Sequence, residues 1–161
     1  MQTDADILQR IQQAFESCRR PMHFTDHTHC KECAEHDELL RSRDLQTLRI
    51  EDVGNPGWDP ICFATSEAFT YYFPALARLA LSEPAYGYGW YGTVFLFHLV
   101  GDGHRNRRFM ACTPEQRRIV VQFLKHLVET RAAVVDEHCS ADDLVQALEI
   151  WSEEAPAADE V

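Results

Sequence analysis

The stretch TPEQRRIVVQFLKHLV, residues 113–128, decides the fold class. It begins with a threonine that can cap a helix and a proline suited to the first helical position, and Gln116 stands at the reciprocal capping-box position. An apolar stripe then recurs every three or four residues: Ile119, Val120, Phe123, Leu124, Leu127 and Val128. This pattern predicts a long amphipathic helix that begins at Pro114 and packs one face against a core.

Similar periodicity elsewhere predicts a mainly α, single-domain, irregular bundle of about six helices with a long packed loop. The other helices are expected from a Thr3 or Asp4 cap to Cys18, from a Thr28 cap to about Arg43, from Thr65 or Ser66 to Leu81, and after a Ser140 cap. The short apolar run 94–100 fits either a buried helix or a strand, and a helix is favoured. Pro74 predicts a kink or a break at Phe73. Turn residues in 44–60 predict the packed loop.

The length and composition of the chain predict a single domain with one hydrophobic core. The chain has 161 residues, of which 45% are hydrophobic, and a chain of this size buries about 70% of its unfolded surface. We expect residues 1–152 to form the domain and the acidic tail, residues 153–161, to be disordered.

The net charge of -11 opposes binding to phosphate backbones and to anionic lipid. We therefore expect neither nucleic acid nor a membrane as a partner. The first residues carry two acids where an export signal needs basic residues, and the longest apolar stretch, 94–100, is far shorter than the ~20 residues that span a bilayer. The expectation is a soluble, cytoplasmic protein.

The six cysteines are expected to be reduced in that compartment. Four stand alone and are expected to be small buried hydrophobes: Cys18, Cys62, Cys112 and Cys139. Cys30 and Cys33 form a CxxC motif, whose spacing lets two thiolates converge on one metal ion.

The candidate site is HTHCKECAEH, residues 27–36, which holds five side chains able to bind zinc. His36 lies one further helical step beyond Cys33, and His27 or His29 could complete a tetrahedral shell from the preceding loop. The predicted zinc ligands are Cys30, Cys33, His36 and His27. A remote fourth ligand, Cys62 or His98, would fit equally well.

Two other interpretations of this stretch stay open. In the first, Cys33 and His36 are core residues and the other histidines lie on the surface. In the second, the first helical turn lowers the pKa of Cys30 for thiol redox chemistry, although no βαβ pattern surrounds it. Hydrolytic metal motifs are absent: the sequence has no His-Glu-x-x-His, and the chain is too short for an eightfold barrel.

Three further features favour ordinary structural roles. The Gly and aromatic loop 86–92 could be a ligand platform, but its rings are more typical of core anchors. The basic turn 102–109 could bind an anion, but a solvated loop paired with the protein's own acids is favoured. His98, between Phe97 and Leu99, is interpreted as a core histidine with a satisfied ring.

Three stretches resemble an uncharacterised bacterial family, one of the domains of unknown function: CKEC at 30–33, SEAFTYYFPAL at 66–76, and TPEQR at 113–117 continuing through VQFL at 121–124. Together they span residues 30–124. Phe73 stands where the family pattern has leucine. The resemblance implies a small bacterial protein and transfers no mechanism, because the family has none assigned.

These observations predict a binding or accessory module with one structural zinc ion rather than an enzyme. A filled tetrahedral shell leaves no position for water, so the metal would stabilise the fold without catalysing a reaction. Its partner would be a protein that no motif identifies. The alternative is an enzyme that uses an exposed Cys30 thiolate or a metal with a vacant position.

Overall fold

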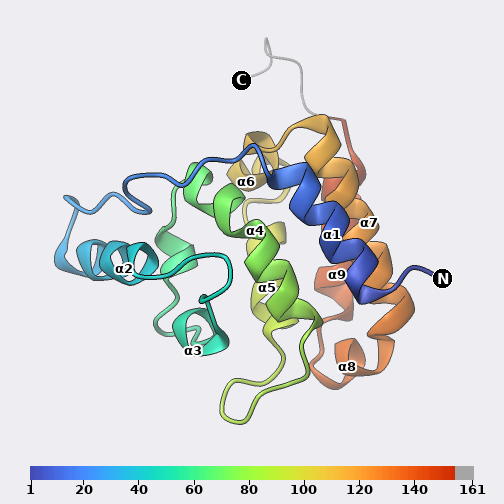
Figure 1. Cartoon of the computed structure of the whole chain (residues 1–161). Helices are drawn as coiled ribbons and strands as arrows, with labels where there is room; N and C mark the ends of the chain where they lie inside the picture. The colour runs from blue at the N-terminus through green and yellow to red at the C-terminus, as the bar shows by residue number, and fades with distance from the viewer. Residues whose placement is uncertain (155–161) are drawn as a thin grey trace.

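The computed structural model describes residues 1–154, in which nine α-helices and two 3-10 helices are the regular elements (Figure 1). The α-helices are α1 (Asp4–Phe15), α2 (Lys31–Arg41), α3 (Ile50–Val53), α4 (Ser66–Leu81), α5 (Tyr91–Val100), α6 (Arg107–Ala111), α7 (Pro114–Thr130), α8 (Ala132–Glu137) and α9 (Ala141–Ser152). The 3-10 helices are η1 (Pro60–Phe63) and η2 (Gly103–Arg105). The mainly α class is confirmed, and about six helices was too few because short helices occupy the loops.

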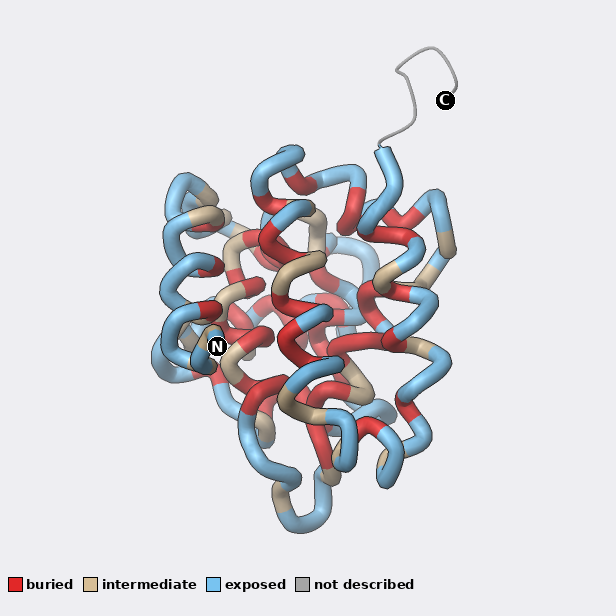
Figure 2. The backbone as a smooth tube through the Cα atoms, turned by 90° about the vertical axis from the view of Figure 1, so that its right-hand side faces the viewer, coloured by how far each residue is buried: buried red, intermediate tan, exposed pale blue. Residues whose placement is uncertain are grey.

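The core forms where α1, α4, α5, α7 and α9 pack together. α4 lies at its centre and buries residues on nearly all sides, as expected of a helix that is apolar all round. Phe73 of α4 stacks on Phe15 of α1 at a centroid distance of 4.5 Å and contacts Phe95 of α5 at 5.6 Å. Figure 2 shows the buried residues along the inward faces of the helices.

Local signals placed some helix ends correctly and others wrongly. Thr3 and Thr113 both form capping boxes, and α7 begins at Pro114 as predicted. Of the predicted kink or break at Phe73, the break does not occur: α4 continues past Pro74 to Leu81, and the residues on both sides of the proline are packed into the core. Ser140 precedes α9 but makes no side-chain cap, and its hydroxyl bonds Thr93 Oγ1 at 2.9 Å instead.

The expected packed loop contains α3 and is followed at once by η1, and α2 packs against η1. In Figure 1, α2 and α3 lie together on the side of the molecule away from α7 and α9. This part of the fold carries the candidate site.

The expected disorder of the tail falls largely on residues 155–161, outside the described residues. Glu153, at the start of that tail, lies within ion-pair distance of His104: its Oε2 is 2.8 Å from the ring Nδ1. Within residues 1–154, no helix combines the length and apolar character needed to cross a membrane.

Candidate metal centre

The site lies where α2 begins, and a cysteine caps this helix. Cys30 has extended backbone angles, and its Sγ accepts the N–H of Cys33 at 3.4 Å. The predicted cap, Thr28, is wrong because its hydroxyl donates to Asp26 Oδ1 at 3.0 Å. The Cys30 sulfur therefore lies at the positive end of the helix dipole, which favours a thiolate.

Three side chains converge at this helix start. The sulfurs of Cys30 and Cys33 and a ring nitrogen of His29 all lie within 4.8 Å of one another. The distance between Cys33 Sγ and His29 Nδ1 is 3.7 Å. Cys30 is exposed and Cys33 is buried, so the group extends from the surface into the first turn of α2.

The three groups change one another's protonation. The Cys33 N–H and the His29 ring lower the pKa of Cys30 to about 7. The Cys30 sulfur in turn raises the pKa of Cys33 and the pKa of His29. One sulfur of the pair is thus readily ionised near neutral pH while the other keeps its proton.

His36, a predicted ligand, does not belong to this group. Its ring is fully buried between Trp58, at a centroid distance of 4.3 Å, and Phe63, at 4.8 Å. Glu32 Oε1 lies 3.4 Å from Nε2 without the geometry of a hydrogen bond. Neither ring nitrogen of His36 has a hydrogen-bond partner within residues 1–154.

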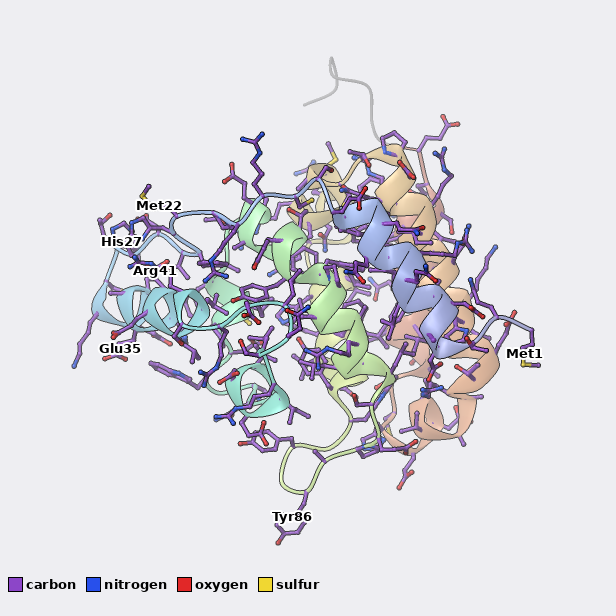
Figure 3. The ribbon with its side chains drawn as sticks, viewed as in Figure 1. Met1, Met22, His27, Glu35, Arg41 and Tyr86 are labelled. Atoms are coloured by element: carbon purple, nitrogen blue, oxygen red, sulfur yellow. The ribbon has the colours of Figure 1, made fainter. Side chains whose placement is uncertain are left out.

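His27, the other predicted histidine, lies in a second group. Its ring stacks on His23 at a centroid distance of 3.7 Å, and His23 Nδ1 is 2.9 Å from Asp37 Oδ2. Ligand atoms of these three residues also lie within 4.8 Å of one another. Figure 3 shows His27 beside Met22 at the α2 end of the molecule. Sequence reasoning missed His23 and Asp37, because neither belongs to a recognisable motif.

Asp37 joins the segment before α2 to the helix itself. Besides His23, its carboxylate accepts the N–H of Phe24 at 2.6 Å and of Thr25 at 3.3 Å. Burial raises the pKa of Asp37, but the hydrogen bonds from His23 and from these amides hold it below its ordinary value. The ionised carboxylate therefore fixes the chain that leads into the cysteine pair.

The two remote candidates, Cys62 and His98, form a third group with Asp59. His98 is buried, and its Nε2 is 2.8 Å from Asp59 Oδ2, so its ring has a hydrogen-bond partner as predicted. Of the four lone cysteines, Cys112 is buried as expected, whereas Cys62 and Cys139 are exposed and that expectation was wrong for them.

The aromatic loop 86–92 and the basic turn 102–109 each place some side chains in solvent and others in the core. Tyr86 points into solvent at the tip of its loop (Figure 3), while Trp90 is a buried core anchor as predicted. In the basic turn, Arg108 is buried and donates to the Ile61 carbonyl at 3.1 Å. The expectation of a solvated basic loop paired with the protein's own acids is therefore wrong at Arg108, whereas His104 does lie beside an acid, Glu153.

The fold and the group at Cys30 define a class: a small, mainly α-helical protein with a cysteine and histidine cluster at a helix start. The sequence matches the profile of DUF6714, a family of unknown function, over residues 3–155, and the chain belongs to this family. No curated protein and no solved structure matches the chain.

Proposed function

We propose that the chain is a zinc-binding accessory module in which Cys30, Cys33 and His29 hold the ion. Zinc prefers thiolate and imidazole ligands, and the CxxC spacing at a helix start supplies two thiolates together with an N–H donor to one of them. His29 replaces His36 of the sequence prediction because it lies beside both cysteines.

The observation that carries the proposal is the distance between Cys33 Sγ and His29 Nδ1. Bonds of about 2.3 Å to sulfur and 2.0 Å to nitrogen, at tetrahedral angles, place these ligand atoms about 3.5 Å apart. The distance between them in the protein is 3.7 Å. Zinc binding at this pair therefore needs little rearrangement, and the cost of ordering the ligands is small.

A tetrahedral zinc ion has a fourth position besides the three that these side chains would fill. His27 fills it, as the sequence predicts, if its ring leaves the stack on His23; otherwise a water or a side chain of a partner protein does. His36 would have to leave its place between Trp58 and Phe63, where its ring is wholly buried. The proposed role of the ion is to order residues before α2 and to present them to a partner.

Metal analysis of the purified chain tests this proposal. We expect about one zinc ion per chain to be lost when Cys30→Ser and Cys33→Ser are combined, and His29→Ala to weaken binding. Cys139→Ser is the matched control, since Cys139 is exposed and belongs to none of the three groups. Equal zinc content in the double variant and the control would contradict the proposal.

A second function, dithiol exchange, is supported by the unequal exposure of the two cysteines. An exposed thiolate on Cys30 attacks a substrate disulfide and releases one thiolate; buried Cys33 then attacks the Cys30 sulfur and releases the second. The chain's two thiols become a disulfide, and the substrate disulfide becomes two thiols.

Oxidised glutathione is a suitable probe for this exchange in the metal-free chain. An internal Cys30 to Cys33 disulfide, mapped by mass spectrometry, would support this second function. A stable glutathione adduct on Cys30, with Cys33 still reduced, would contradict it. Neither result changes what zinc analysis of the untreated chain reports.

A further inference from the structure

A separate buried group lies between η1 and α5, apart from the proposed zinc site. Asp59 caps η1 by accepting the Ile61 N–H at 2.9 Å, and its other oxygen, Oδ2, faces His98 of α5. Cys62 Sγ lies 3.8 Å from the same oxygen. Asp59 and His98 are almost completely buried, while Cys62 is at the surface.

The spacing of these atoms is close to that of a tetrahedral zinc site. A carboxylate oxygen and a sulfur on one zinc ion are about 3.6 Å apart, and an oxygen and a nitrogen about 3.4 Å. The 3.8 Å between Cys62 Sγ and Asp59 Oδ2 is already close to the sulfur to oxygen spacing of such a site. The His98 to Asp59 distance, 2.8 Å, is that of a direct hydrogen bond, so a cation would enter by opening this pair by roughly 0.6 Å.

A cavity of about 360 Å³ adjoins the group, with mainly apolar walls. Its lining includes Asp59 and Cys62 from the group and Thr93, Val94 and Phe97 from α5. Phe97 is 59% exposed, which is unusual for a large apolar side chain beside a cavity. The cavity has the volume of a small-ligand site, and two of the three side chains in the group, Asp59 and Cys62, line it.

Two buried polar groups around this site lack partners. Within the described chain, neither the Tyr91 hydroxyl nor Arg108 Nε makes a hydrogen bond. An unpaired buried polar group costs about 1–3 kcal/mol. Such groups persist where a ligand or an ion supplies the missing interaction.

We propose that Asp59, Cys62 and His98 form a second zinc site with a fourth position open to the cavity. Three protein ligands and one exchangeable position are the arrangement of reactive rather than structural zinc. The ligand that fits is a small molecule with an anionic or other metal-binding head group and an apolar body. Its head group would take the fourth position, and its body would contact Val94 and Phe97.

Cobalt replaces zinc as a coloured probe in the test. In a chain with Cys30→Ser and Cys33→Ser, we expect about one cobalt ion per chain, with the near-ultraviolet charge-transfer band of a single thiolate. Adding Cys62→Ser should abolish this band, and adding Cys139→Ser should leave it unchanged. Azide, added as a small anionic probe, should shift the visible cobalt bands, because it enters the fourth position.

Absence of the band from the double variant, or its persistence after Cys62→Ser, would overturn the second site. Circular dichroism of each variant shows whether the helices are retained. If the double variant fails to fold, alkylation of the unaltered chain replaces the cobalt test: zinc should protect Cys62 from iodoacetamide and leave Cys139 reactive. Equal labelling of Cys62 with and without zinc would overturn the proposal.

Discussion

Replacing His36 with leucine should stabilise the protein and leave the proposed zinc site intact. The His36 ring is wholly buried, and neither of its nitrogens has a hydrogen-bond partner within the described residues. Each unpaired buried polar group destabilises the folded state by about 1–3 kcal/mol, so removing both should raise the free energy of unfolding by about 2–6 kcal/mol. Leucine has a similar volume, so the site between Trp58 and Phe63 is refilled without a large cavity.

The loss of aromatic contact opposes this gain. His36 makes two ring contacts, with Trp58 and Phe63, and each such pair contributes about 0.5–1.5 kcal/mol beyond the area that it buries. Losing both ring contacts therefore costs about 1–3 kcal/mol, which is set against the gain of about 2–6 kcal/mol. The free energy of unfolding should rise by about 2 kcal/mol for His36→Leu. In a chain of this size that gain raises Tm by about 4–8 °C.

Urea and thermal unfolding, each measured with zinc and with a chelator, provide the assay, and zinc content is measured on the same samples. Glu32→Gln is the control, because Glu32 Oε1 lies 3.4 Å from His36 Nε2, and we expect its effect to stay within about 0.5 kcal/mol. A lower Tm for His36→Leu together with lost zinc would refute the reasoning. That result would identify His36 as the ligand, in place of His29.

Three further predictions concern the core and its loops. Asn106→Ala should cost about 3 kcal/mol in urea unfolding, because its buried amide bonds three carbonyls near the end of α5 and caps α6; a loss below about 1 kcal/mol would contradict this. Gly92→Ala should cost about 1–3 kcal/mol, since the new methyl group would overlap the Trp90 indole, whereas Gly57→Ala should change Tm little, because its methyl group would meet only Asn55 Oδ1, at a van der Waals distance of 3.4 Å. The pKa of Asp37 lies below 3.8 in the folded protein, so its ionised form adds stability above about pH 4 that is lost as the pH falls through the folded pKa. Asp37→Asn should therefore reduce the drop in unfolding free energy between about pH 5 and pH 3, and an unchanged drop would contradict this.

Sequence reasoning succeeded where the signal is local. The start of α7 follows from the threonine, proline and glutamine at residues 113–116, which cap the helix by contacts within one turn. It failed at the start of α2, where two residues compete for the cap. The Thr28 hydroxyl bonds Asp26, and the Cys30 sulfur takes the place of the oxygen that usually caps a helix.

The candidate site was predicted in part for the same reason. The CxxC pair is local, and His29 was one of the histidines considered for its fourth position. The burial of His36 depends on Trp58 and Phe63, more than 20 residues further along the chain, and no periodicity in residues 27–36 indicates them. Asp59 was interpreted as a turn residue, and its pairing with His98 arises only when η1 packs beside α5.

Zinc K-edge X-ray absorption of the Cys62→Ser chain tests the central claim most directly, since that variant removes the thiolate of the second site. We expect two sulfur ligands at about 2.3 Å and nitrogen at about 2.0 Å, with one sulfur lost in a chain that also carries Cys33→Ser. A spectrum with only nitrogen and oxygen ligands, or one unchanged by Cys33→Ser, would contradict it.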